Sequence, residues 1–511
     1  MDVTDFLHGF RRLETNNSRQ EALDRLLDEI TPYEWRALHA HTSSRSFQFD
    51  IVGKAPLELV AHVFRYLDTT APYRYQIVSR RWNHNLRSLH VLKASLGPWY
   101  EGTVDLHTFD YALCLQKARN IHSFRTGKPS SIYKITPSET ASRLSLVGNY
   151  LIWDQYHYTD DPQRGSRQVC ILHLETWRLR TVCGEAREQL FEFHASDEIV
   201  VLTTFANIAY VYELEGPRFK KFRVPSGDYF KTVACRALTV ACVASFAEHT
   251  SVYIWQYDTG RGRTFKIDHD PGTLFSIFDP YVIHAISPLI QPETETIILF
   301  VDAQRSEKLP YDQRKIAYSR YTYSGECIGD FQPSLPGIGS IESMGSWERF
   351  VPVNFQANQF AIPMRSALGE GQDRIHTFFL LHFDEGLNSL RVWEDSQLPG
   401  PIRCSGGAMA WWKDTCYGFF YHEGERRDMI AHMGTSDKKT YTPIVSEPRH
   451  DTPWAYHRSR VNALVVLNDK YVIRSTASIF YVLCFDGEDN GNRPKENGPF
   501  FDLGTLEVLG K

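Results

Sequence analysis

The sequence feature that most restricts the possible folds is a repeated pattern, here called a phrase, of short apolar runs. It returns several times after about residue 144. The runs are rich in Val, Ile, Tyr and Phe, and Gly, Asp, Asn or Pro separates them, as is typical of strands and turns. The phrase occupies Leu146–Leu179, Glu198–Val224 and Leu238–Ile267. Because this spacing lies within the ~40–50 residues of a propeller blade, the sequence predicts an all-β propeller over residues 144–511.

Later segments extend the count of repeats to about seven blades, with six or eight blades, or a pair of β-sandwiches, as alternatives. These further candidates are Tyr281–Phe331, Phe350–Glu394, Ala408–Val445 and Val461–Phe501. Val252–Gly260 is similar to the third strand and turn of WD-type repeats, but the Trp-Asp dipeptide occurs only at Trp153–Asp154, so the repeats are degenerate. Polar insertions at Gln304–Gln313 and Ser366–Arg374 are expected on one rim, where such loops often bind.

The first hundred residues have a helical pattern instead. Residues 1–46 predict a helical extension, with a capping box expected at Ser18–Glu21 and a helix start at Thr31, where Pro32 and Glu34 follow. Residues 47–92 predict a second helical unit and residues 93–143 a linker to the β region. The chain is therefore predicted to be an α+β multidomain protein, with N-terminal helices preceding the propeller.

The helix that begins after Pro56 is apolar on two sides. Leu57, Val60, Ala61, Phe64 and Leu67 form one stripe, and a second stripe is made by Leu59, Val63 and Tyr66. A helix of this kind has to bury both stripes. One stripe can serve a small core, and the other needs a partner. Three short helices hold little core of their own, so we expect this unit to take stability from a partner chain or from its flanking domains.

Residues Ala55–Asp68, followed by Val78–Asn83 and Leu86–Arg87, resemble the F-box. The pattern of that family is a Leu-Pro-x-Glu start, an apolar helix ending in Tyr-Leu-Asp and a Val-Ser/Cys-x-x-Trp helix at this spacing. The resemblance implies a substrate-receptor subunit of an SCF-type cullin–RING ubiquitin ligase. Its helices would bind the adaptor subunit, and through it the cullin, and its propeller would bind a protein substrate.

Carried over by position, the resemblance implies roles for individual residues. The adaptor-binding residues would be Pro56, Leu59, Val63 and Trp82. The core of the motif would be formed by Phe64, Leu67, Val78 and Leu86. Ala55 stands where the family usually has Leu, which reduces one apolar anchor by ~2–3 kcal/mol, unless Ile51 or Val52 compensates.

Composition limits the possible functions and cellular compartments of the chain. The chain has 511 residues, enough for two or three domains, and its net charge of -5 does not indicate a nucleic-acid partner. Without a membrane-spanning run or a signal-peptide pattern, we expect a cytosolic or nuclear protein. Nine dispersed cysteines without a Cys-x-x-Cys pair are expected to be reduced thiols. No cofactor is predicted.

Catalytic and metal-binding motifs are missing from the sequence. Asp268–His269–Asp270 offers metal ligands, but Pro271–Gly272 follows directly, which favours a turn. Gly337–Gly339 is expected to be a loop, and one ring of Trp411–Trp412 is expected to be buried. We therefore expect a non-catalytic receptor. An F-box scaffold acting outside ubiquitin ligation is the alternative, and a propeller hydrolase or lyase ranks last.

Overall fold

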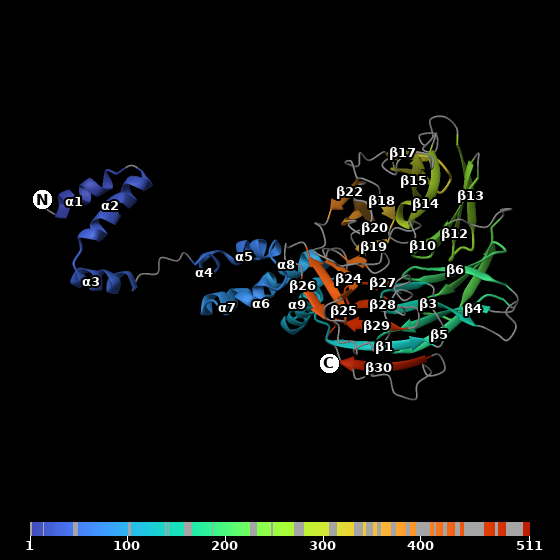
Figure 1. Cartoon of the computed structure of the whole chain (residues 1–511), viewed down its shortest axis with the longest axis horizontal. Helices are drawn as coiled ribbons and strands as arrows, with labels where there is room; N and C mark the ends of the chain where they lie inside the picture. The colour runs from blue at the N-terminus through green and yellow to red at the C-terminus, as the bar shows by residue number, and fades with distance from the viewer. Residues whose placement is uncertain are drawn as a thin grey trace.

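The computed structural model describes two groups of helices followed by a β region (Figure 1). The described residues are 3–13, 15–43, 50–100, 104–137, 141, 143–157, 166–185, 188–224, 232–246, 249–269, 281–305, 314–331, 341–343, 351–354, 359–368, 375–384, 389–394, 409–412, 415–422, 427–434, 440–443, 464–475, 479–486 and 504–510. Within these ranges, no helix is both long enough and apolar enough to span a membrane.

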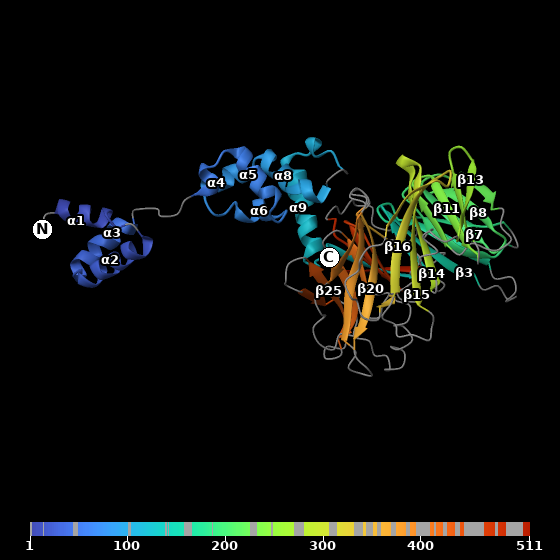
Figure 2. The same cartoon turned by 90° about the horizontal axis from the view of Figure 1, so that it is seen from above.

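The first group of helices is set apart from the rest of the chain in both views (Figures 1 and 2). It consists of α1 (Val3–Arg11), α2 (Asn16–Glu29) and α3 (Pro32–Ser43). The cap of α2 is Thr15, whose side chain accepts a hydrogen bond from Ser18 N at 3.1 Å, so the expected cap at Ser18 was placed three residues too late. The box at Thr31 is confirmed, because Glu34 Oε2 accepts from Thr31 N at 2.8 Å.

The second group lies between the first group and the sheets (Figure 2). Its members are α4 (Ile51–Lys54), α5 (Leu57–Arg65), α6 (Ala71–Tyr75), α7 (Arg80–Leu86), α8 (Leu89–Tyr100), η1 (Leu106–Thr108) and α9 (Tyr111–Arg125). Ser79 caps α7 as predicted, since its side chain accepts from Trp82 N at 3.1 Å. A small core made by Val52, Val60, Phe64 and Leu86, among others, holds α4, α5 and α7 together.

The predicted linker over residues 93–143 differs from what the structure contains. Most of α8, all of α9 and the strand β1 (Ser131–Pro137) lie in these residues. The change of sequence pattern near residue 144 predicts that the β region starts there. Instead, the first strand precedes it and is separated from its sheet partners by more than 300 residues of sequence.

Beyond the helices, the described strands form seven antiparallel sheets. The first three sheets are β2 (Leu144–Val147), β3 (Tyr150–His157), β4 (Ser166–His173) and β5 (Arg178–Cys183); β6 (Leu190–Ala195), β7 (Ile199–Thr204), β8 (Ile208–Glu213) and β9 (Phe219–Arg223); and β10 (Thr232–Arg236), β11 (Thr239–Ser245), β12 (His249–Gln256) and β13 (Gly262–Asp268). The first predicted repeat covers all four strands of its sheet, whereas the second and third cover only the last three strands, because β6 and β10 precede Glu198 and Leu238.

The later sheets follow in chain order around the β region (Figure 1). They are β14 (Tyr281–Gln291), β15 (Thr296–Arg305), β16 (Arg314–Thr322) and β17 (Cys327–Phe331); β18 (Ile341–Ser343), β19 (Val351–Asn354), β20 (Gln359–Leu368), β21 (Ile375–Asp384) and β22 (Ser389–Glu394); and β23 (Met409–Trp412), β24 (Thr415–His422), β25 (Arg427–Gly434) and β26 (Thr440–Pro443). The last sheet holds β27 (Leu464–Leu467), β28 (Tyr471–Ser475), β29 (Phe480–Cys484), β1 and β30 (Gly504–Gly510).

Consecutive sheets pack against each other through apolar side chains. One cluster joins the second sheet to the third, as in the stacking of Phe222 on Trp255 at 4.6 Å. Another joins the last sheet to the first, where Trp153 meets Phe480 at 5.4 Å. A run of four-stranded antiparallel sheets in which the last sheet packs on the first is consistent with a β-propeller.

The start and the end of the β region share one sheet. β1 pairs with β29, with Ile135 opposite Phe480, and on its other edge with β30, with Ile135 opposite Leu506. Pairing both edges of β1 removes an open strand edge, which would otherwise be free to pair with another chain. It also ties the helical group to the end of the chain, because β1 directly follows α9.

Candidate functional site

The two stripes of α5 have different surroundings. Val60, Ala61 and Phe64 are buried in the small core described above, whereas Leu59 is 56% exposed and Val63 is 51% exposed. Leu59 and Val63 are four positions apart in the sequence, so they lie on one side of the helix. As the sequence predicted, one stripe serves the core of the unit and the other is not covered by this chain.

Further large apolar side chains are exposed beside this stripe, on the end of α5, on α6 and in the turn before α7. We define the exposed α5–α7 set as Leu59, Val63, Tyr66, Leu67, Tyr75, Ile77 and Val78. Ile77 is 90% exposed. Isolated exposed apolar residues are ordinary on protein surfaces, whereas this short helical unit exposes seven of them.

Two residues expected in the core of the motif are exposed instead. Phe64 and Leu86 are buried as predicted, but Leu67 and Val78 belong to the exposed set. The prediction for Leu67 was wrong because α5 ends at Arg65, so the helical spacing no longer applies two residues later. Val78 lies in the turn between α6 and α7, where helical spacing does not apply either.

Pro56 and Trp82 flank the exposed stripe in different ways. Pro56 is exposed at the start of α5, where its carbonyl accepts a hydrogen bond from Val60 N at 3.1 Å. Trp82 is only partly exposed, and its Nε1 donates to Asp50 Oδ1 at 2.6 Å. The same Asp50 oxygen accepts from Gly53 N at 2.7 Å. Sequence reasoning missed Asp50, although an Asp ahead of a helix start is a capping signal.

The segment that holds the exposed α5–α7 set is rich in basic residues. Residues 51–87 carry six Lys or Arg side chains and two acidic ones. All six of these basic residues are exposed, namely Lys54, Arg65, Arg74, Arg80, Arg81 and Arg87. An apolar surface with a basic rim is complementary to an apolar surface with an acidic rim, and such complementarity speeds encounter and selects the partner.

Asp68 connects this unit to α9. Its Oδ1 accepts hydrogen bonds from the backbone and side chain of Thr70, and its Oδ2 lies 3.0 Å from Arg125 Nη1. Partial burial of the carboxyl opposes ionisation, but the Thr70 hydrogen bonds and the charges of Arg125 and His122 outweigh it, so the pKa of Asp68 is lowered.

We expect Asp68→Asn to reduce the acid sensitivity of the protein. A carboxyl with a lowered folded pKa stabilises the fold above its unfolded pKa of about 3.9, and this stabilisation is lost as the pH falls through the folded pKa. Because the pair is partly exposed, the effect should stay under about 1 kcal/mol. Urea unfolding measured from pH 7 to pH 3 should show a smaller decline for the variant than for the parent. Asp24→Asn on exposed α2 is the control, and an equal decline in both variants would contradict the role of Asp68.

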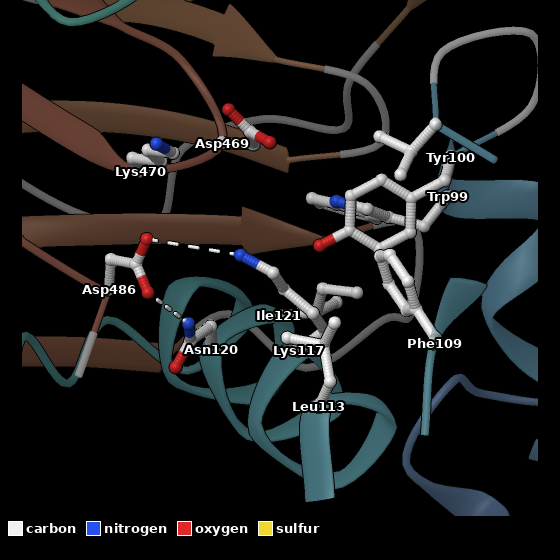
Figure 3. Close-up of a pocket in the computed structure, with 11 residues that line it drawn as sticks. Trp99, Tyr100, Phe109, Leu113, Lys117, Asn120, Ile121, Asp469, Lys470 and Asp486 are labelled. Atoms are coloured by element: carbon white, nitrogen blue, oxygen red, sulfur yellow. Dashed lines mark hydrogen bonds and ion pairs between the residues drawn. The ribbon is translucent and has the colours of Figure 1, made fainter. Parts of the chain in front are cut away.

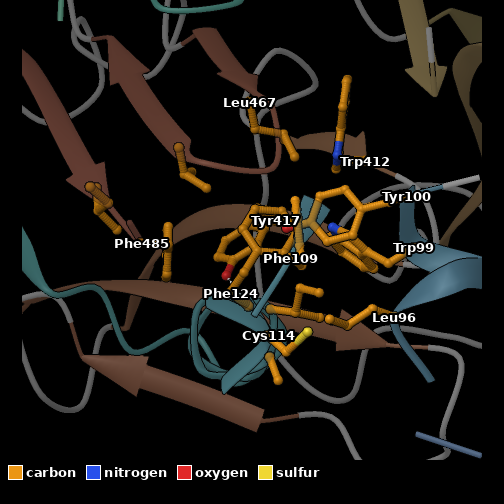
Figure 4. Close-up of a cluster of buried hydrophobic side chains, with 14 of the residues drawn as sticks. Leu96, Trp99, Tyr100, Phe109, Cys114, Phe124, Trp412, Tyr417, Leu467 and Phe485 are labelled. Carbon is orange, nitrogen blue, oxygen red and sulfur yellow. Dashed lines mark hydrogen bonds between the residues drawn. The ribbon is translucent and has the colours of Figure 1, made fainter. Parts of the chain in front are cut away.

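The helices and the sheets share one apolar core (Figure 4). Phe124 of α9 contacts Trp99 of α8, Tyr417 of β24 and Phe485 after β29, with ring centroids 6.0, 5.1 and 5.4 Å apart. The hydroxyl of Tyr417 donates to the carbonyl of Phe124, and burial raises the pKa of that hydroxyl. A well-packed core of this kind fixes α8 and α9 relative to the sheets, and α8 in turn packs against α5.

Strand connections distinguish the two ends of the β region. In a sheet of four antiparallel strands, the connections between strands one and two and between strands three and four lie at one end. The connection between strands two and three lies at the other end, together with the link from strand four to the next sheet. The helices pack at the former end, where Asn120 of α9 donates to Asp486 after β29 at 2.6 Å. Links to the next sheet are longer and belong to the opposite end, as at 224–231, 269–280, 395–408 and 444–463.

The two polar insertions predicted to lie on one rim fall largely outside the described residues. Both connect the second strand of a sheet to the third, namely β15 to β16 and β20 to β21. Gln304 and Ser366 are themselves strand residues, and residues 306–313 and 369–374 lie outside the described part of the chain. Between the described strands, the longer stretches of sequence therefore connect strand ends at the end of the β region that faces away from the helices.

The other sequence candidates do not assemble into a catalytic or metal site in the described residues. Nε2 of His269 lies 3.0 Å from the hydroxyl of Thr250, while Asp270 and Gly337–Gly339 fall outside the described ranges. Trp412 is buried in the core that joins helices and sheets. No cluster of three metal-ligating side chains occurs among the residues searched. The seven cysteines whose side chains are described are all free thiols.

Comparisons with known proteins find structural likeness at low similarity. No protein-family model matches the chain, and no curated protein matches it. The chain is similar to the β-propeller domain of the trilobed protease from Pyrococcus furiosus (TM-score 0.41, 9% identity, covering 68% of this chain and 94% of that chain). It is also similar to a chain of the mitotic checkpoint complex (0.38, 6%, 70% and 95%) and to the WD40 domain of SCAP from fission yeast (0.34, 12%, 68% and 85%). At these values, the assignment of the fold is carried by the strand order and the packing between sheets.

Proposed function

We propose that this chain is a non-catalytic substrate-receptor subunit of an SCF-type cullin–RING ubiquitin ligase. The second helical group would bind the adaptor subunit through Pro56, Leu59 and Val63, beside Trp82. The β region would bind a protein substrate. The observation that carries the proposal is the outward stripe of α5, where Leu59 and Val63 are half exposed in the segment that resembles the F-box.

The size of the apolar surface is sufficient for a specific complex. Full burial of a Val or Leu side chain contributes about 1.5–3 kcal/mol, and the exposed α5–α7 set has seven large apolar members. Association and side-chain ordering cost part of that energy. Ala55, which packs against the small core, offers less apolar area than the Leu usual in the family. The exposed basic residues, Arg74 and Arg80 among them, lead us to expect acidic side chains on the partner.

The shared core between helices and sheets fits a receptor that has to position its substrate. A ligase receptor works by raising the effective concentration of substrate lysines near the conjugating enzyme. This requires a stable relation between the adaptor-binding helices and the substrate-binding end, which the packing around Phe124 provides. We assign substrate binding to the end of the β region with the longer connecting stretches of sequence, and place the complex in the cytosol or nucleus, where free cysteines persist.

Affinity purification of the full-length tagged chain tests the proposal. We expect a ligase adaptor and a cullin to co-purify, and at least one further chain to accumulate in the complex when the proteasome is inhibited. Mass spectrometry of the purified complexes, with and without inhibitor, measures this. Purification without any adaptor would contradict the proposal. An adaptor complex in which no ubiquitinated chain accumulates would instead favour a scaffold that acts outside ubiquitin ligation.

A further inference from the structure

A pocket of about 300 Å³ lies at the seam between the helical group and the last sheet (Figure 3). One side of it is apolar, where Trp99, Tyr100 and Phe109 present their rings together with Leu113 and Ile121. The pocket reaches the surface at Val104, which is 41% exposed. Pockets at such seams, with an apolar wall and a few polar groups, are the usual form of small-ligand sites.

The polar side of the pocket comes from α9, from the β27–β28 turn and from the end of β29. Asp486 accepts a hydrogen bond from Asn120 Nδ2 at 2.6 Å, and its other oxygen lies 4.0 Å from Lys117 Nζ. Lys470 Nζ donates to Glu175 Oε1 at 3.0 Å. In Figure 3, Asp469, Lys470 and Asp486 lie on one side of the pocket and the rings of Trp99, Tyr100 and Phe109 on the other.

The lining carries two Lys and two Asp side chains, and Glu175, which pairs with Lys470, adds a third carboxylate beside it. Lys117 is matched by Asp486, and Lys470 is matched by Glu175. The carboxylate of Asp469, the next lining residue, has no hydrogen bond or ion pair with a described side chain. Asp469 also attracts Lys470 electrostatically, without an ion pair between them. The negative charge of Asp469 is near enough to contribute to the raised pKa of Tyr100, although burial of the ring is the main cause. The pocket thus combines aromatic faces with one surplus carboxylate.

We propose that this pocket binds an organic ammonium ion with a small apolar body. The ammonium group would pair with Asp469, and the apolar body would lie against Trp99, Tyr100 and Phe109. Aromatic faces attract organic cations, and they do so most strongly where water is partly excluded. A simple anion would be repelled by Asp469 while Lys117 and Lys470 are already paired. This inference is independent of the proposed ligase function.

Ligand-observed NMR and calorimetry on the full-length protein test the inference with three probes. The probes are 2-phenylethylamine as a free amine, N-acetyl-lysine methylamide as a peptide-borne amine, and 3-phenylpropionate as an anion of matched shape. We expect at least one cation to bind and the anion not to bind. The stronger of the two cations then identifies the free or the peptide-borne source. Binding of the anion at equal or greater strength, or binding of none of the probes, would overturn the inference.

Two variants locate the binding. Asp469→Asn should lower the affinity for the cation about tenfold or more, because one charge-assisted contact is lost. Its control is Asp197→Asn, which changes an exposed Asp in the equivalent turn between β6 and β7. Val104→Trp places a large ring at the mouth of the pocket and should also abolish binding, whereas Ile328→Trp on exposed β17 should not. Unchanged binding in either pocket variant, in a protein with the parent melting temperature, would refute the site.

Discussion

The variant Leu59→Glu/Val63→Glu is expected to bind the ligase adaptor at least about a hundredfold more weakly than the parent chain, with the melting temperature unchanged. Two half-exposed side chains that become buried on binding contribute about 1.5–3 kcal/mol each when fully covered, and a hundredfold loss corresponds to about 2.7 kcal/mol. A carboxylate placed in an apolar contact adds a desolvation cost. Because both positions are about half exposed in the free chain, the substitutions leave its own core intact.

Surface plasmon resonance or calorimetry with purified adaptor measures the loss. A matched control is Leu23→Glu/Leu26→Glu on α2, where two Leu side chains of similar exposure lie outside the proposed interface. The control should bind like the parent. Adaptor affinity retained within about threefold by Leu59→Glu/Val63→Glu would contradict the proposed interface. A lowered melting temperature of that variant would mean that the stripe serves the fold instead.

The substitution Phe124→Ala is expected to destabilise the protein by about 3–5 kcal/mol, the range for large aromatic side chains removed from cores. Phe124 is fully buried and contacts rings from α8, β24 and the residue after β29. The cavity left behind would remove contacts between the helical group and the sheets. The loss of stability should therefore appear in both parts of the chain.

Urea unfolding followed by tryptophan fluorescence and by far-ultraviolet circular dichroism measures this effect. We expect both signals to shift to lower urea together. Phe205→Ala is the control, because Phe205 is exposed in the turn after β7, where its ring contacts Phe191. It should cost under about 0.5 kcal/mol. A helical signal that is unchanged in Phe124→Ala would show that the helices do not depend on the shared core.

Local patterns allowed much of the element order to be predicted from the sequence. The caps at Thr31 and Ser79 were recognised because a capping residue and its partner lie within three or four positions. The first three sheets were recognised because the Gly, Asp and Asn turns between their strands are short. Gly260, at a positive φ of 65°, is one such turn residue.

Predictions failed where a local pattern was extended past the end of its element. Leu67 follows helical spacing on paper, but α5 has already ended, so the side chain is exposed. The cap of α2 is Thr15 and not Ser18, since both residue types can cap and the pattern alone does not choose between them. For Pro56, Leu59, Val63 and Trp82, the structure gives exposure and neighbours, and their adaptor contacts stay a prediction.

The sequence by itself determined that helices precede sheets. It also determined that α5 has a second apolar stripe, for which the short neighbouring helices offer little apolar surface to pack against. These properties depend on spacing over a few residues, where the backbone geometry is fixed. Only the tertiary structure decided that β1 closes the last sheet between β29 and β30. It also decided that α8 and α9 meet Asp469 and Asp486 around a pocket. Contacts between residues more than 300 positions apart depend on how the sheets close on one another, and no local spacing records that.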